Sequence, residues 1–304
     1  MPLAPTLADE LPLSWTRACL PLPRWQAVRL PFSGFTWLAY ATLPPDYTLD
    51  HLQRDYLPGT RLLLRGCSAS LAGQLAIAGW ECIRVGIEGL VDLRGHSLQR
   101  RSVRKMVRAA QRFGQVVEMP WSPSAVAHLR WLAREARYGQ RPQLRYLFRT
   151  IFEPETRLFV FVDTDGIWQG ALLLTQPAAT TAVTELMLRR KQAPAGVMET
   201  LFATAGQTLQ AEGFHFLSLN EVPFHHLDHR LRPLERLVTL VGRQMSAVYD
   251  TNGLYHFKAK FAPVWRPVYI CAQSRLSLLA FVDLFTVSGC LELAASSLYR
   301  QRAA

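Results

Sequence analysis

Two apolar runs separated by a turn sequence constrain the fold of this chain most strongly. Residues 157–162 and 168–174 are rich in Leu, Val and Phe, and they flank Asp163-Thr164-Asp165-Gly166. Aspartate followed by glycine favours a tight turn between strands, so this stretch predicts a β-hairpin. The pattern continues with a strand, a helix and a further strand, over residues 182–188, 197–211 and 215–220. The predicted order in the second half is therefore β-β-β-α-β.

The first half also reads as mixed α/β. Strands are predicted over residues 35–43, 61–67 and 81–93, and a helix is predicted over 69–78. A basic helix follows from about Ser97 to Phe113, with Ser97 as its N-cap and Gly114 as its C-cap. A further helix begins at Ser122-Pro123.

Length and pattern together predict two α/β (α+β) domains with mixed sheets, because a domain takes roughly 150 residues and the chain has 304. We predict an irregular arm, a first domain with the basic helix, a second domain that carries the chemistry, and a C-terminal helix. Their expected bounds are 1–23, 24–140, 141–275 and 276–304.

Charge points to a polyanionic partner. The chain holds 34 Lys and Arg against 23 Asp and Glu, a formal net charge of +11, which suits nucleic acid, anionic lipid or phosphate.

Five cysteines without C-x-x-C spacing argue against a disulfide framework and a zinc ribbon, and favour a reducing cytoplasm. Residues 1–13 lack the basic and apolar regions of a signal peptide, so we do not expect secretion.

The densest charge lies between Asp92 and Glu118, where seven residues are basic and none is acidic. In helical register Val103, Val107 and Ala110 share one face, and the cations lie on the other. The cationic face is either solvated or a polyanion site, and the like charges at i,i+4 spacing favour the polyanion site. The candidate residues are Arg100, Arg101, Arg104, Lys105, Arg108 and Arg112.

A carboxylate interrupts the apolar strand 182–188, and cations follow that strand. Glu185 is either a buried, paired structural carboxylate or a site group that binds an ammonium or takes a proton. Arg189 and Arg190 end the strand just before a helix N-terminus, which favours an anion. The Q/R-x-x-G-x-G/A pattern of coenzyme A-dependent acetyltransferases is absent, so coenzyme A is only weakly supported.

Polar residues also end the next strand. Asn220 and Glu221 lie near Glu185 if the two strands are neighbours, and otherwise they cap and turn the chain. In the segment 253–269, Lys258 and Lys260 share one side if the chain is extended there. The aromatic residues around these lysines either shield a ligand or form an apolar wedge beside solvated side chains.

Several kinds of site find no support. The run from His225 to His229 lacks the glutamate of H-E-x-x-H and a third ligand, so we predict a solvated loop and no metal. Phosphate-loop and nucleophile-elbow motifs are also absent, which leaves ATP activation and serine hydrolysis unsupported.

The apolar stretch 276–298 contains Asp283 and Glu292, so it is not a spanning helix; it either packs on the core or lies in a membrane interface.

These motifs together resemble the C-terminal catalytic domain of bacterial phosphatidylglycerol lysyltransferases, the aminoacyl-phosphatidylglycerol synthases. The resemblance covers roughly residues 60–272. The basic helix takes part in it, and the other similar pieces are Gly86 to Leu93, Glu185-Leu186-Met187 with Arg189-Arg190, Ala193-Pro194-x-Gly196-Val197-Met198, and Leu254-Tyr255-x-Phe257-Lys258-x-Lys260-Phe261-x-Pro263-x-Trp265-x-Pro267-x-Tyr269.

The resemblance implies two tandem GNAT-like domains and transfer of an aminoacyl group from aminoacyl-tRNA to a hydroxyl of phosphatidylglycerol or a related lipid. The donor ester is already activated, so no cofactor is expected. The family's membrane-embedded flippase part has no counterpart in these 304 residues. We therefore expect a stand-alone enzyme, cytoplasmic or peripheral on the inner face of the membrane, with its oligomeric state left open.

The resemblance also implies roles for the candidate residues. Glu185 would bind the ammonium or assist proton transfer, and Arg189 and Lys258 would stabilise the oxyanion or the lipid phosphate. Arg190, Asn220, Glu221 and Lys260 would bind substrate, with Lys260 on phosphate, and the basic helix would hold the tRNA acceptor stem.

Two departures from the family pattern stand out. Glu185 replaces an aspartate, and the arginine that follows is displaced by one residue to Arg189, which changes its strand face. The transferred amino acid and the acceptor therefore stay open. Other hypotheses are a peptide, sterol or small-molecule acceptor, a coenzyme A-dependent acyltransferase, and a non-catalytic module that binds nucleic acid or membrane.

Overall fold

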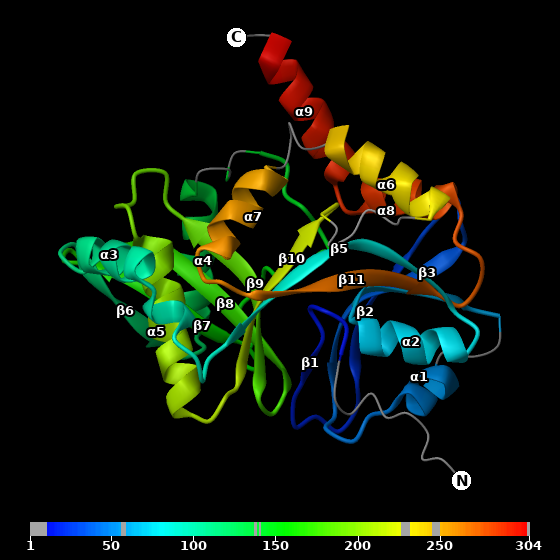
Figure 1. Cartoon of the computed structure of the whole chain (residues 1–304), viewed down its shortest axis with the longest axis horizontal. Coiled ribbons are helices and arrows are strands. Elements are labelled where there is room, and N and C mark those ends of the chain that lie inside the picture. The colour runs from blue at the N-terminus through cyan, green and yellow to red at the C-terminus, as the bar shows by residue number, and fades with distance from the viewer. Residues whose placement is uncertain are drawn as a thin grey trace.

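A long mixed sheet runs through the whole molecule (Figure 1). The computed structural model describes residues 11–55, 59–136, 139, 141–225, 232–244 and 250–302. Among these residues the strand order is β1-β3-β4-β11-β5-β10-β9-β8-β7-β6, with β2 paired to β3. The strands are β1 (Thr16–Arg17), β2 (Arg24–Arg29), β3 (Phe35–Leu43), β4 (Arg61–Cys67), β5 (Glu81–Asp92), β6 (Gly114–Met119), β7 (Arg157–Asp163), β8 (Trp168–Ala178), β9 (Thr181–Arg189), β10 (Phe216–Pro223) and β11 (Val264–Ala272).

Helices cover both faces of this sheet (Figure 1). They are α1 (Leu49–Asp55), α2 (Ala69–Ile77), α3 (Arg101–Ala110), α4 (Pro123–Glu135), α5 (Val197–Ala211), α6 (Pro233–Gln244), α7 (Thr251–Ala259), α8 (Leu278–Val287) and α9 (Cys290–Arg302), with a 3-10 turn η1 (Ser97–Gln99) before α3. The predicted mixed α/β class, the hairpin of β7 and β8, and the β-β-β-α-β order are confirmed.

The strand β5 joins the two halves of the molecule. It is twelve residues long and pairs antiparallel with β10 on one side and with β11 on the other. Strands of the two predicted domains also pair with each other: β6 pairs with β7, and the last strand, β11, lies between β4 and β5. The predicted domain bounds stay a prediction, since strands from both parts form one sheet.

Alternating side chains build separate cores on the two faces of the sheet, as the period of two in a strand requires. Phe159 and Phe161 pack with α3 and α5, whereas Leu158 and Val160 pack with α4 on the other face. In the other half of the sheet, α2 covers one face, and α6 and α8 cover the opposite one.

The basic helix is shorter than predicted. Its N-cap is Arg100, whose extended backbone separates α3 from η1, and its C-cap is Gln111. The predicted caps Ser97 and Gly114 are therefore wrong. Leu98 in η1 packs closely on α5, since a Cβ at Gly206 would lie 2.1 Å from its Cδ1. Gly114 instead starts β6, a strand the sequence analysis did not predict.

The segment with the two candidate lysines is helical rather than extended. Asp250 caps α7 by accepting a 2.7 Å hydrogen bond from the Gly253 amide. Lys258 lies in the last turn of α7, and Lys260 is the C-cap. The expectation that both lysines share one side of a strand is therefore wrong, and they face different surroundings.

The C-terminal stretch forms two helices, α8 and α9. Residues Ala280, Phe281 and Leu284 on the inner side of α8 are buried in a core that also includes Val238 of α6. No single described helix is long and apolar enough to cross a membrane; α8 and α9 satisfy that test only together, with a 67° bend between them.

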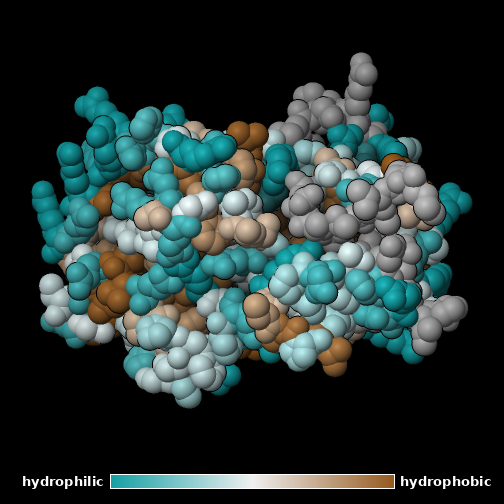
Figure 2. All heavy atoms as spheres, turned by 90° about the horizontal axis from the view of Figure 1, so that it is seen from below, coloured by the Kyte–Doolittle hydropathy of each residue, from teal (hydrophilic) through white to brown (hydrophobic). Residues whose placement is uncertain are grey.

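One face of the molecule is mainly hydrophilic. Figure 2 shows it from below, the side opposite to the one where α6 and α8 lie in Figure 1. Hydrophilic side chains dominate that view, and the apolar patches between them are small and separate. The described residues therefore form no broad apolar contact surface on this side.

Candidate active site

The two strands that carry Glu185 and Asn220 part in the middle of the sheet. Strands β9 and β10 pair in parallel only from Phe216–Thr181 to Ser218–Val183, although β9 continues to Arg189 and β10 to Pro223. Asn220 bridges the opening, since its Nδ2 donates a 2.7 Å hydrogen bond to the Thr184 carbonyl oxygen. The two strands are neighbours, as the prediction for Asn220 required.

Both strands are irregular at this point. The pairing of β8 with β9 shifts register so that Glu185 is the extra residue, and the pairing of β10 with β5 shifts between Ser218 and Glu221. Asn220 has a φ of 64°, in the left-handed region, which asparagine tolerates better than most residues. Such bulges redirect side chains and recur next to active sites. We call Glu185, Asn220, Glu221 and Lys258 the polar centre.

Lys258 reaches the polar centre from α7. Its Nζ donates hydrogen bonds of 3.0 and 2.9 Å to the carbonyl oxygens of Asn220 and Glu221. The residue is only 2% exposed. Burial lowers the pKa of the Lys258 ammonium to about 7, against the opposing effect of Glu221 and Glu88. At neutral pH a large share of this amine is therefore uncharged.

Glu221 lies between two cations. Its carboxylate is buried and forms an ion pair with Arg65 of β4, and it also acts electrostatically on Lys258. Gly86 of β5 makes room for it, because a Cβ there would lie 2.7 Å from the Glu221 Oε1 and equally close to the Val222 oxygen. A side chain at position 86 would displace Glu221.

Glu185 is buried and fully engaged. Its Oε1 accepts a 2.8 Å hydrogen bond from the Thr175 hydroxyl, and its Oε2 accepts a 2.9 Å bond from the Arg149 amide. Burial raises the pKa of the Glu185 carboxyl, and the hydrogen bonds from Arg149, Thr175 and Ser14 oppose this rise. These contacts agree with the structural alternative for Glu185. Thr184, the residue before it, accepts the hydrogen bond from Asn220.

Arg149 holds this part of the centre together, and the sequence analysis did not identify it. Its guanidinium is buried and donates to the Ser14 oxygen at 3.0 Å and to the Ala41 oxygen at 2.6 Å. It also bonds the Thr42 hydroxyl and pairs with Glu153. Arg149 stands in an irregular segment without a periodic pattern, so no signal in the sequence points to it.

The remaining candidates lie apart from the polar centre. Arg189 is four residues beyond Glu185, about 13 Å along a strand, and donates to the Ala193 oxygen at 2.8 Å. The Arg190 guanidinium stacks 5.3 Å from the Trp131 ring centre. Lys260 forms a 2.9 Å ion pair with Glu199 in the first turn of α5. The structure thus brings Asn220, Glu221 and Lys258 into contact. Arg189, Arg190 and Lys260 lie apart from them, at the ends of β9 and α7.

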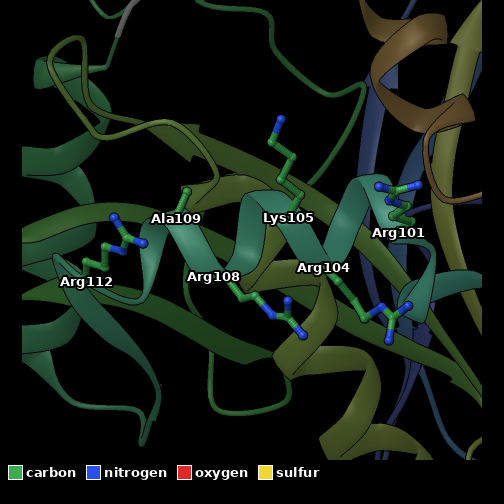
Figure 3. A pocket seen from close by; sticks show the side chains of 6 residues that line it. All are labelled: Arg101, Arg104, Lys105, Arg108, Ala109 and Arg112. Carbon is green, nitrogen blue, oxygen red and sulfur yellow. The ribbon is translucent and has the colours of Figure 1, made fainter.

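The cations of α3 form an open basic surface. Figure 3 shows Arg104 and Arg108 pointing to one side of the helix and Lys105 to the other. Together with Arg101, Ala109 and Arg112 they line a surface hollow of about 570 Å³. No described carboxylate forms an ion pair with any of these cations, so their charge is not neutralised within the described part of the chain.

The basic helix also lies against the start of α5. A Cβ at Gly196, which has a φ of 92°, would lie 2.2 Å from the Met106 oxygen of α3. Only glycine fits this close approach in this backbone conformation. Because α5 directly follows β9, the basic surface and the polar centre are connected through one short stretch of chain.

The described residues contain no group of three or more His, Cys, Asp or Glu side chains placed to hold a metal ion. The predicted loop of histidines lies largely outside those residues, since only His225 of that run is described. His225 stacks on Tyr255 of α7, with ring centres 5.2 Å apart, and Tyr255 stacks on Trp265.

Comparison with known proteins identifies a family. The family model of the phosphatidylglycerol lysyltransferase C-terminal region matches residues 48–272. L-PGS from Bacillus licheniformis is similar in structure, with a TM-score of 0.65 and 19% identity over 88% of this chain and 85% of that one. The C-terminal domain of a putative lysylphosphatidylglycerol synthetase from Agrobacterium fabrum has a TM-score of 0.59 and 24% identity, over 76% and 73% of the two chains.

A search of curated protein sequences gave no match.

Proposed function

Because the chain belongs to the phosphatidylglycerol lysyltransferase C-terminal family, we propose that it transfers an aminoacyl group from aminoacyl-tRNA to a hydroxyl of phosphatidylglycerol or a related lipid. Family membership supports aminoacyl transfer to a lipid in general. The observation that carries the proposal for this chain is Lys258, a buried lysine with a pKa of about 7 beside Asn220 and Glu221.

The reaction needs a proton acceptor. The lipid hydroxyl attacks the ester carbonyl, a new ester bond forms, the bond to the tRNA ribose oxygen breaks, and the proton passes from the hydroxyl to that oxygen. A neutral amine has two N–H groups and one lone pair. The oxygens of Asn220 and Glu221 account for both N–H groups of Lys258, so its lone pair is left to take the proton and return it to the ribose oxygen.

The other candidates surround this step. Glu185 is already engaged by its hydrogen bonds from Thr175 and Arg149, so in this proposal it supports the strand beside Asn220, and its role on the amino group of the donor stays a prediction. Asn220 and Glu221 hold Lys258 and shape the opening between β9 and β10. Arg189, Arg190 and Lys260 lie further out, where they suit the phosphates of a substrate rather than the reacting carbonyl.

The basic surface of α3 suits the donor. A row of cations on one helix gives affinity that depends on salt and little on sequence, as contacts to phosphates do. The surface packs against the start of α5, next to the strand that carries Glu185. A tRNA acceptor stem on α3 would therefore lie beside the start of α5, a short stretch of chain from the end of β9.

The decisive experiment measures transfer directly. Purified protein is incubated with phosphatidylglycerol vesicles and total tRNA charged with labelled amino acids, and the label is followed into the organic phase. Label in the lipid establishes the reaction, and single amino acids then identify the donor. If tRNA binds but all label stays in the aqueous phase, the lipid acceptor is wrong.

The tRNA assignment has its own prediction. We expect Arg104→Glu with Arg108→Glu to weaken tRNA binding about tenfold or more, because two cations that face phosphate become anions. The slope of log affinity against log salt should also fall by about two, at about 0.9 per lost phosphate contact. A salt titration of tRNA binding measures both.

A matched control lies on the other face of the sheet. Arg130 and Arg134 are exposed, have the same i,i+4 spacing and belong to α4, which packs on the opposite face from α3. Reversing these two charges changes the net charge equally but should leave the salt slope as in the wild type. Equal loss in both double variants would show that only the net charge matters and would remove the assignment to α3.

A further inference from the structure

The outer face of α8 is apolar. Leu278, Leu279 and Val282 lie on it and are 51, 52 and 45% exposed. The inner face of the same helix holds buried residues, including Ala280 and Leu284. An ordinary surface helix turns charged or polar residues outward, so α8 presents an apolar face that nothing in the described part of the chain covers.

The tip of the hairpin between β2 and β3 adds a phenyl ring to this face. Asp283 is buried on α8 and accepts hydrogen bonds from the Phe32 amide at 3.1 Å and from the Ser33 amide and hydroxyl at 2.7 and 2.6 Å. The tip is thereby fixed to α8, while the Phe32 side chain stays 63% exposed. A buried carboxylate with several donors is a firm anchor.

Cations flank the apolar face at its N-terminal end. Arg232 and Leu234 of the α6 side and Arg275 and Leu278 of the α8 side line one surface hollow of about 640 Å³. No described carboxylate forms an ion pair with Arg275.

The acidic residues beside the hollow are already engaged. Glu235 is buried and accepts hydrogen bonds from the amides of Arg84 and Arg232. Glu81 accepts a 2.5 Å bond from the Leu276 amide. The charge that this region presents to a partner is therefore positive.

We propose that this face docks on an anionic phospholipid bilayer. The docking face consists of Phe32, Leu278, Leu279 and Val282, with Arg232 and Arg275 beside it. Exposed leucine, valine and phenylalanine side chains enter the boundary between headgroups and acyl chains, and nearby arginines attract the phosphates of anionic lipids. A second copy of this chain carries the same net charge of +11 and would be repelled, whereas an anionic lipid surface complements both the cations and the apolar side chains. The inference concerns where the protein meets the membrane and does not depend on the transfer reaction.

The test compares binding to two kinds of vesicle. Wild-type protein should sediment with vesicles of phosphatidylglycerol and phosphatidylcholine in equal parts, and much less with phosphatidylcholine alone. The double variant Leu279→Glu with Val282→Glu should lose about tenfold or more of this binding, because two carboxylates then face the lipid. Both side chains are about half exposed, so the melting temperature should stay near that of the wild type.

Two further variants serve as controls. One tests whether any exposed apolar side chain contributes to vesicle binding, and the other tests the contribution of the cations. Ile77→Glu replaces a residue that is 91% exposed on α2, across the sheet from α8, and should bind vesicles as the wild type does. Arg275→Glu should weaken binding to the anionic vesicles and leave the weak binding to phosphatidylcholine unchanged.

Three outcomes would overturn the proposal. One is that the double variant sediments as the wild type does. Another is that Ile77→Glu loses as much binding as the double variant. The third is that the double variant loses only self-association, which would mark an interface between copies. Failure of the transfer reaction is distinguishable, because a wild type that binds vesicles through α8 but transfers no label keeps this inference. A docking variant should in turn still transfer label to phosphatidylglycerol dispersed in detergent.

Discussion

Replacing Lys258 with methionine is expected to lower the rate of aminoacyl transfer about a thousandfold, within the range that general base catalysis contributes. Methionine keeps most of the length and the apolar contacts of the lysine side chain but has no amine. The fold should survive, since a mostly buried amine with a pKa of about 7 is replaced by an apolar group. The label assay gives the rate, and tRNA binding should stay as in the wild type.

The pH dependence shows which role Lys258 plays. If its neutral amine accepts the proton, the transfer rate of the wild type should rise with pH through about 7. If the ammonium stabilises the oxyanion or a lipid phosphate instead, the rate should fall over the same range. Lys258→Arg separates the two roles again, because a guanidinium keeps the charge but accepts no proton. Transfer retained in Lys258→Arg would contradict the role as a base.

The lowered pKa of Lys258 also predicts that the stability of the fold depends on pH. The Lys258 pKa is lowered in the fold from 10.5 to about 7, so between these values the unfolded chain binds the proton more tightly than the folded chain does. The contribution of Lys258 to the free energy of unfolding should therefore rise with pH, by about 1.4 kcal/mol per pH unit. Below about 7 both states are protonated, and this contribution should not change with pH. The difference between wild type and Lys258→Met isolates it from other groups.

Local sequence patterns predicted much of the fold. The strands at 35–43 and 61–67 begin and end where expected, and Ser122 caps α4 through its hydroxyl, which accepts from the Ala125 amide. These features depend on neighbours along the chain. The contact of Leu98 with α5 just before the break at Arg100 could not be predicted in this way, because α5 lies about a hundred residues away in the sequence.

The polar centre was only partly predictable for the same reason. Asn220 stands at the end of a recognisable strand, so its contact with Thr184, next to Glu185, followed from the pairing of two strands. Lys258 was identified as a candidate, but its burial and lowered pKa arise from α7 lying over the end of β10. Arg149 carried no signal, because the residues it binds come from the arm, from β3 and from its own loop.

Replacing Arg149 with methionine is expected to lower the free energy of unfolding by about 3 kcal/mol or more. The buried oxygens of Ser14 and Ala41 would lose their donor, and Glu153 would lose its partner. Arg149→Lys should recover little of this loss, since one ammonium group cannot replace a planar guanidinium that donates to partners in several directions. Urea unfolding monitored by tryptophan fluorescence measures the free energy.

The control for this prediction lies in the same loop. Arg145 forms a 2.6 Å ion pair with Glu292, but both side chains are more than half exposed, so Arg145→Met should cost less than about 1 kcal/mol. Similar losses in the two variants would show that Arg149 does not stabilise the centre. A large loss in Arg149→Met alone would instead show that the fold depends on a guanidinium joining the arm, β3 and the loop that fixes Glu185. The Arg149 amide donates a hydrogen bond to the Glu185 carboxylate. Local unfolding of the loop around Arg149 should therefore reduce transfer before the sheet itself unfolds.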